Sequence, residues 1–264
     1  MAGGTSETSE NAGRRQASHL VSPDLSPLLV IGAGRGGTSL LTACLDGHSR
    51  LHVESEAFAA DTLLGLKLPV TDPRRLLGQR LDRFHACCEE ARARHPGLVW
   101  GNKITTEHVF GLEDHNALNP PYVDVTRRLV ERMAGYRIVF VLRDGRACID
   151  SKVRRTGQPV ALAAFRWRYS VQVLRSLRQT PSLRAVVRFE DLVLEPRVVL
   201  EGVCDALGIA FEEGMLEQTE SDLLVKEYRQ PGFVAEKAAP AELPPEILAF
   251  IRGDLAECGY DVET

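Results

Sequence analysis

No stretch of this chain is apolar enough to cross a membrane. Nothing in it approaches the roughly 18 consecutive apolar residues that a spanning helix needs. The first 26 residues are rich in glycine, serine, threonine and glutamate and lack the apolar segment of a secretory signal. We therefore expect residues 1–26 to be a disordered leader and the protein to be cytoplasmic.

Metal-binding sequence patterns are also missing. The six cysteines form no C-x-x-C pair, and no cysteine–histidine spacing suggests zinc. Cys87 and Cys88 are adjacent in a predicted helix, where their side chains would point about 100° apart and could hardly form a disulfide. We expect six reduced thiols and predict no metal site.

An excess of positive charge is absent as well. The formal net charge is −4, which argues against a partner of the nucleic-acid class. With 264 residues, 44% of them apolar and 26% charged, the chain can bury a large core. We therefore expect one globular domain over residues 27–264.

Glycines gather instead at one place, directly after an apolar segment of strand type. Residues 32–39 read GAGRGGTS and lead into an amphipathic segment. Glycines allow a ligand to approach the backbone, and free N–H groups at a helix N-terminus attract anions. The arginine and the two hydroxyl groups add further donors. The sequence therefore predicts a phosphate-binding loop with these candidate residues: Arg35, Gly36, Gly37, Thr38 and Ser39.

Three kinds of phosphate site compete for this loop. It fits the dinucleotide pattern G-x-G-x-x-G, and Glu54 follows about 20 residues later, as in nicotinamide enzymes. An ATP- or GTP-binding loop needs a lysine after its last glycine, but Thr38 follows Gly37 directly. The third possibility is a loop that holds a 5′-phosphosulfate.

A second basic segment favours the third possibility. Residues 136–142 have the pattern of a buried strand and run into the sequence RDGRACIDS at 143–151. Two such elements at the ends of parallel strands can hold one ligand in the crevice of a sheet. A donor with a separate 3′-phosphate needs this second site, whereas a nicotinamide enzyme does not. Arg143 and Ser151 are its candidate residues.

In these two segments the chain resembles the sulfotransferase superfamily, which uses 3′-phosphoadenosine 5′-phosphosulfate (PAPS). The loop is similar to the family's R-S-G-T-[ST]-L sequence, with Gly36 in place of the serine. Arg143 and Ser151 keep the eight-residue spacing of the 3′-phosphate motif, in the R-D-G-R-A form of the tyrosylprotein sulfotransferases. The resemblance also implies that Arg155 helps to hold the 3′-phosphate. It covers roughly residues 27–210.

Two catalytic positions follow from the same resemblance. Residues 46–56 are similar to a tyrosylprotein sulfotransferase segment that ends at the catalytic glutamate, which implies that Glu56 is the base. Residues 100–103 are similar to the [GN]-[NE]-K strand end, whose lysine stabilises the transferring group, here Lys103. Other residues remain open as the base: Glu54, His48 and His52.

The resemblance implies in-line sulfuryl transfer from PAPS to a hydroxyl or amine, without a metal. It leaves the acceptor open among glycans, lipids, natural products, phenols and peptide tyrosines. A proline-rich loop at 228–245 would cover the nucleotide, with Lys237 near a phosphate. The alternatives are a Rossmann-type NAD or FAD oxidoreductase, a non-catalytic nucleotide-binding relative and a P-loop kinase.

Strand and helix patterns alternate along the chain. This predicts an α/β fold of three layers, P-loop NTPase-like, with a mostly parallel sheet and helices on both faces. The strands are expected at 28–32, 50–53, 97–102, 136–142 and 184–189. The helices are expected near 37–46, 73–95, 120–134, 145–155, 159–179, 195–207, 212–218 and 244–257. A core stripe is predicted on the helix at 159–179, comprising Leu162, Phe165, Tyr169, Val173 and Leu177, and Trp167 is expected to be buried against another helix.

Overall fold

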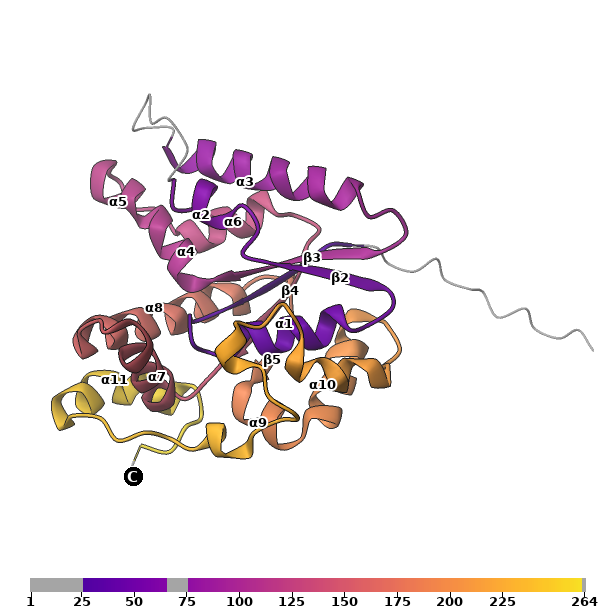
Figure 1. Cartoon of the computed structure of the whole chain (residues 1–264). Coiled ribbons are helices and arrows are strands. Elements are labelled where there is room, and N and C mark those ends of the chain that lie inside the picture. Colours follow the sequence, from indigo (N-terminus) through magenta and orange to yellow (C-terminus); the bar gives the residue numbers. More distant parts are fainter. Residues whose placement is uncertain (1–25, 66–75, 263–264) are drawn as a thin grey trace, which may run out of the picture.

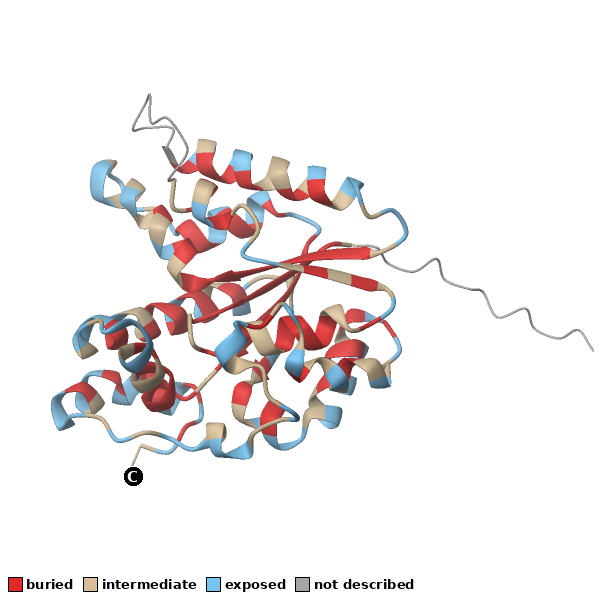
Figure 2. Cartoon of the chain, viewed as in Figure 1, coloured by how far each residue is buried: buried red, intermediate tan, exposed pale blue. Residues whose placement is uncertain are grey.

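Five parallel strands in the order β2-β3-β1-β4-β5 form the centre of the fold (Figure 1). The computed structural model describes residues 26–65 and 76–262. The strands are β1 (Leu28–Gly32), β2 (Leu51–Ser55), β3 (Val99–Thr105), β4 (Arg137–Leu142) and β5 (Leu183–Arg188). Every residue of β1, β3 and β4 is buried, as expected for inner strands of a parallel sheet (Figure 2).

Alternate residues of the strands face two separate layers of helices. Leu28 and Val30 of β1 pack in one apolar cluster with residues of α1, α9 and α10. Leu29 and Ile31 pack in the other cluster, with residues of α3, α6, α8 and α11. The predicted three-layer α/β fold is therefore confirmed.

The α-helices are α1 (Thr38–Asp46), α2 (Ala59–Thr62), α3 (Leu76–Ala93), α4 (Thr106–Phe110), α5 (Asp114–Leu118), α6 (Val125–Arg132), α7 (Gly145–Thr156), α8 (Val160–Arg178), α9 (Phe189–Leu194), α10 (Pro196–Leu207) and α11 (Pro245–Glu257). Short 3₁₀ helices are η2 (Gly111–Glu113), η3 (Glu213–Glu220), η4 (Lys226–Tyr228) and η5 (Ala235–Ala238). Among the described residues, no helix is both long and apolar enough to span a membrane.

Most expected boundaries agree with these elements, and the differences have local causes. The helix expected at 120–134 begins only at Val125, because Asp124 caps it by accepting a hydrogen bond from Arg127 N (2.9 Å). β3 continues to Thr105, which places Lys103 inside the strand. The segment expected as a helix at 212–218 forms η3. The expected leader lies outside the described residues apart from its last residue.

The predicted core stripe on α8 is wrong in its first half. Leu162 and Phe165 are 40% and 45% exposed, whereas Ala163 and Ala164 are buried. Ala163 and Ala164 pack in the apolar core in their place, and Trp167 packs against α7, where a Cβ on Gly145 would lie 2.8 Å from its ring. Trp167 is 1% exposed, so its expected burial is confirmed.

Candidate active site

The loop between β1 and α1 has a backbone that requires glycine. Gly36 N donates to Ala33 O (2.8 Å), which closes a tight turn. Arg35 and Gly37 have φ values of 74° and 93°, in the left-handed region. A Cβ on Gly37 would lie 2.1 Å from the ring of Phe189. The loop is thus fixed by the sequence, and it leads directly into α1.

A cavity of about 570 Å³ opens beside this loop. Its wall combines the start of α1, one side of α7, the start of α9 and the segment 219–237. Of the residues predicted to bind the donor, all but Gly36 line this cavity: Arg35, Gly37, Thr38, Ser39, Arg143, Ser151 and Arg155. Gly36 contributes to the turn instead.

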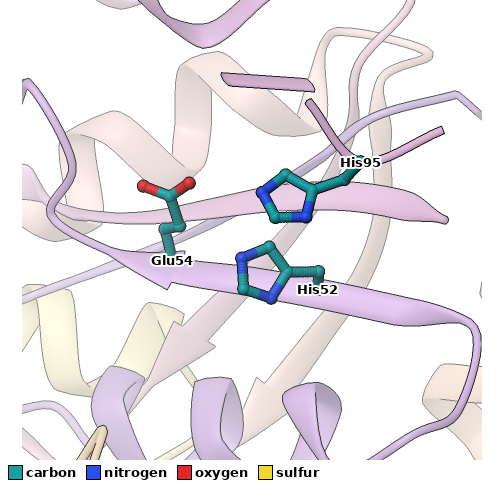
Figure 3. Close-up of side chains that lie close together, drawn as sticks. All are labelled: His52, Glu54 and His95. Atoms are coloured by element: carbon teal, nitrogen blue, oxygen red, sulfur yellow. The ribbon is translucent and has the colours of Figure 1, made fainter. Parts of the chain in front are cut away.

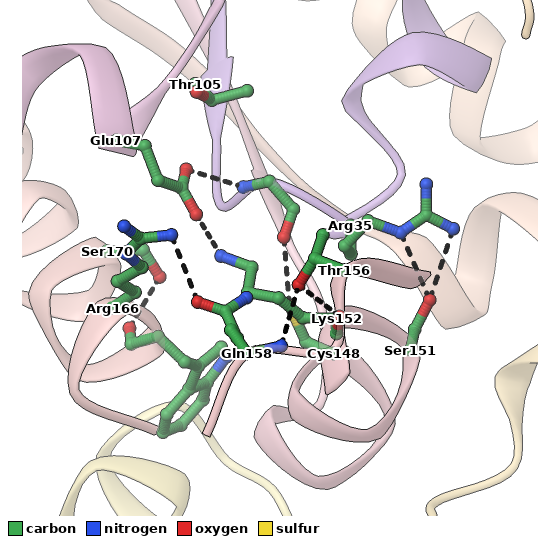
Figure 4. A network of polar contacts seen from close by, with 12 residues as sticks. Arg35, Thr105, Glu107, Cys148, Ser151, Lys152, Thr156, Gln158, Arg166 and Ser170 are labelled. Carbon is green, nitrogen blue, oxygen red and sulfur yellow. Dashed lines mark hydrogen bonds and ion pairs between the residues drawn. The ribbon is translucent and has the colours of Figure 1, made fainter. Parts of the chain in front are cut away.

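Direct hydrogen bonds join the two predicted motifs. Arg35 donates from Nε (3.3 Å) and Nη2 (3.2 Å) to Ser151 Oγ, across 116 residues of sequence (Figure 4). Arg143 Nη1 donates to the carbonyl oxygen of Arg35 (3.0 Å). The glycine loop and the segment 143–151, which leads from β4 into α7, therefore form one site at the carboxyl ends of β1 and β4.

Positive charge is concentrated in this site. Arg143 lies over the ring of Phe189 (4.4 Å to the centroid) and donates through Nη2 to Lys237 O (2.9 Å). Its Nε is buried and has no hydrogen-bond partner. Burial lowers the pKa of Lys237, and the nearby charges of Arg143 and Arg35 lower it further. An anion bound here would relieve this repulsion and satisfy the buried donor.

The segment 219–237 covers one side of the cavity. The ring of Tyr228 lies under the guanidinium of Arg35, 4.3 Å from centroid to Cζ. Arg155 lies 6.0 Å from the same ring and 3.7 Å from the carboxylate of Glu227. The loop expected at 228–245 thus contacts both sequence motifs, and Lys237 lies in the cavity wall.

An ion pair between Glu107 and Lys152 contacts the backbone of the glycine loop. Glu107, in α4, accepts a hydrogen bond from Gly34 N (2.9 Å) and forms an ion pair with Lys152 of α7 (Figure 4). Burial raises the pKa of Glu107, but Lys152 and the Gly34 N–H outweigh it and hold that pKa below its usual value. Sequence reasoning missed this pair because nothing near either residue indicates that they meet.

Glu56 and Lys103 are brought together at the ends of β2 and β3. Lys103 Nζ donates to Glu56 Oε1 (2.6 Å), and Glu56 N donates to Lys103 O (2.6 Å). The side chain of Lys103 is 3% exposed and that of Glu56 is 43% exposed. Lys103 faces the α1 side of the sheet, since it alternates with Val99, which packs in that layer.

His108 is a further polar residue at this point, missed in the sequence. Its Nδ1 accepts a hydrogen bond from Thr105 N (3.0 Å), so its Nε2 carries the proton in the neutral ring. That Nε2 lies 3.9 Å from Glu56 Oε2. Burial lowers the pKa of His108 despite the nearby carboxylate of Glu56. The spacing T-x-x-H around the start of α4 is the signal that could have indicated it.

The other candidate bases have different partners. Glu54 Oε1 accepts a hydrogen bond from Trp100 Nε1 (3.1 Å), on the face of β2 opposite to the apolar residues that pack against α1. His48 is 2% exposed, and its Nε2 bonds with Ala210 O (2.8 Å). His52 lies beside Asp46, 3.4 Å from Nδ1 to Oδ1. Of the four candidate bases, Glu56 is the residue whose carboxylate contacts Lys103.

Comparison with known proteins assigns the family. A model of the sulfotransferase family matches residues 27–213, more than half of the chain, so the chain belongs to this family. Its structure is similar to the sulfotransferase domain of the olefin synthase of Synechococcus PCC 7002, with a TM-score of 0.61, 20% identity, and coverage of 89% of this chain and 94% of that domain.

Two further solved structures share the fold. The sulfotransferase domain from the curacin biosynthetic pathway gives a TM-score of 0.60 at 18% identity, with coverage of 91% of this chain and 99% of that one. Sulfotransferase STF9 from Mycobacterium avium gives 0.50 at 13% identity, with coverage of 92% and 79%. The expected membership of the superfamily is confirmed.

Proposed function

We propose that this sulfotransferase takes its sulfuryl group from PAPS and transfers it in line to a hydroxyl or amine, releasing 3′,5′-adenosine bisphosphate. The observation that carries the proposal is the convergence of two motifs on one cationic cavity. Arg35 contacts Ser151, and Arg143 contacts the backbone of Arg35. One cavity with two basic subsites suits a ligand that carries phosphate groups at both its 5′ and 3′ positions.

The residues of the cavity fit this donor. The N–H groups at the start of α1, with Thr38 and Ser39, would hold the 5′-phosphosulfate. Arg143 and Ser151 would hold the 3′-phosphate, with Arg155 and Lys237 at the rim. The buried Nε of Arg143, which lacks a partner, is a donor available for this phosphate.

Glu56 and Lys103 then have complementary roles. The half-exposed carboxylate of Glu56 is accessible to an acceptor and would take its proton, a contribution of roughly 10²–10⁴-fold in rate. Once protonated, Glu56 no longer neutralises Lys103. The buried ammonium group of Lys103 would then stabilise the negative charge on the departing bridging oxygen.

The proposed transfer needs no metal, because fixed cationic side chains balance the charge of the sulfuryl group. We extend the proposal to an alcohol, phenol or amine acceptor, which a glycan, a lipid, a natural product or a peptide tyrosine could each supply. The predicted cytoplasmic location stays a prediction.

Donor binding is tested by thermal shift with 3′,5′-adenosine bisphosphate, 5′-AMP, ATP, NAD and FAD in EDTA. A ligand at about 100 times its Kd stabilises by about 2.7 kcal/mol. At about 2–4 °C per kcal/mol, this raises Tm by about 5–11 °C. The bisphosphate should shift Tm much more than 5′-AMP. A shift with NAD or FAD alone would favour the oxidoreductase and refute the proposal.

Two variants separate binding from chemistry. Arg143→Ala should weaken bisphosphate binding by roughly 1.5–3 kcal/mol, about 10- to 150-fold, because it removes a charge-assisted bond. Glu56→Gln should bind normally but turn over slowly with any acceptor found by screening with radiolabelled PAPS. Arg197→Ala, at an exposed arginine outside the cavity, is the control. Unchanged turnover in Glu56→Gln would remove the assigned base, whereas bisphosphate binding without turnover on any acceptor would favour a non-catalytic protein.

A further inference from the structure

A second cluster of polar side chains lies on the opposite face of β2 from α1. His52 and Glu54 project from β2, and His95 follows α3 in the turn that leads to β3 (Figure 3). One potential ligand atom from each residue lies within 4.8 Å of the others, and all three residues are partly buried. We propose that His52, Glu54 and His95 bind a divalent transition metal ion of the zinc class.

The donor set selects the type of ion. Two imidazole nitrogens and one carboxylate oxygen suit zinc and neighbouring transition metals. Because the three residues are only partly buried, a water molecule can reach the ion as a fourth ligand. Calcium and magnesium require mainly oxygen ligands, of which this cluster offers one side chain. The zinc bond lengths of about 2.0–2.2 Å require the three ligand atoms to move closer together, which partly buried side chains at a sheet edge permit.

Neighbouring residues already orient the ligands. The carboxylate of Asp46 lies 3.4 Å from His52 Nδ1 and also accepts a hydrogen bond from Val53 N (2.7 Å), so its position is fixed. This leaves the other ring nitrogen of His52 for a metal. Trp100 Nε1 donates a hydrogen bond to Oε1 of Glu54, which leaves Oε2 for coordination of the metal. Carboxylate–histidine and donor–carboxylate contacts of this kind are typical around metal ligands.

The two rings are also arranged for a shared ligand. The imidazoles of His52 and His95 lie with their centroids 4.2 Å apart and their planes inclined by 30°. One nitrogen of each ring lies on the side of the Glu54 carboxylate (Figure 3). A metal at this point would link β2, which is an edge strand of the sheet, to the α3–β3 turn. It would therefore stabilise the strand that leads into Glu56.

The test uses the full chain, stripped of metal with a chelator and dialysed. Calorimetric titration with zinc should give one site per chain, and cobalt should give the visible absorption bands of a protein-bound ion. Zinc in excess of its Kd should raise Tm without any nucleotide. Binding should weaken as pH falls, since protons compete for the imidazole nitrogens.

Variants identify the ligands. His95→Ala and Glu54→Gln should each lower zinc affinity at least tenfold, and Asp46→Asn should lower it about 10–100-fold by releasing His52. His85→Ala, at another partly buried histidine, should bind zinc as the unmodified chain does. Circular dichroism without metal checks that each variant folds. Failure to bind zinc, or equal binding by His95→Ala, would overturn the proposal, whatever the result with 3′,5′-adenosine bisphosphate.

Discussion

Replacing Lys152 by methionine tests its ion pair with Glu107, which contacts the glycine loop at residues 32–39. Lys152 is 5% exposed and Glu107 is 22% exposed, so the substitution leaves a carboxylate with little access to water. Removing one partner of a buried pair costs about 3–5 kcal/mol. Because Glu107 keeps some solvent access and the hydrogen bond from Gly34 N, we expect the low end, about 3 kcal/mol.

This loss should be large enough to measure by urea or thermal unfolding. At about 2–4 °C per kcal/mol, Tm should fall by about 6–12 °C. The double variant Lys152→Met with Glu107→Gln is the matched control. Its neutral amide oxygen still accepts from Gly34 N, and no charge remains buried without a partner. We expect the double variant to recover at least half of the lost stability.

The pH dependence gives an independent check. The pKa of Glu107 is lowered in the folded protein, so the stability it contributes is present above its unfolded pKa, about 4.3, and lost as pH falls through the folded pKa. Without Lys152, burial would raise the folded pKa of Glu107 above 4.3, and the variant would lose stability as pH rises through it. The difference between the unmodified chain and Lys152→Met should therefore shrink as pH falls from 7 to about 4.

Two outcomes would refute this reasoning. A destabilisation by Lys152→Met below about 0.5 kcal/mol would be typical of a surface pair and not of a buried one. Equal stability of the single and double variants would mean that the unpaired Glu107 carboxylate carries no penalty. Bisphosphate affinity, measured on the same variants, should fall with Lys152→Met if Glu107 holds Gly34 in place for the donor.

Two further substitutions examine the wall of the cavity. Gly37→Ala should lower the free energy of unfolding in urea by more than about 1 kcal/mol, because φ is 93° and the new Cβ would lie 2.1 Å from the Phe189 ring. Gly202→Ala is the control: this glycine lies on α10 with open space around it, so the alanine should stabilise the fold slightly. Tyr228→Leu removes the ring beneath Arg35 and should weaken bisphosphate binding about two- to fivefold by calorimetry, corresponding to about 0.5–1 kcal/mol. Unchanged affinity would show that this ring does not position Arg35.

Much of the fold was predictable because its signals are local. The apolar strands β1 and β4 are read directly from runs of residues buried on both faces, and the glycine loop is indicated by its own sequence. The prediction on α8 failed because helical periodicity does not reveal which neighbour comes closest. Leu162 and Phe165 are exposed, and Ala163 and Ala164 pack in the core in their place.

The sequence by itself therefore determined the parallel α/β class, the glycine loop and the residue types that the proposed chemistry requires. The tertiary structure alone decided which residues meet. It joined Glu56 to Lys103, Glu107 to Lys152 and His52 to His95, in each case across more than 40 residues of sequence. Such contacts depend on strand order and helix packing, which arise from the burial of the whole core and not from any single segment.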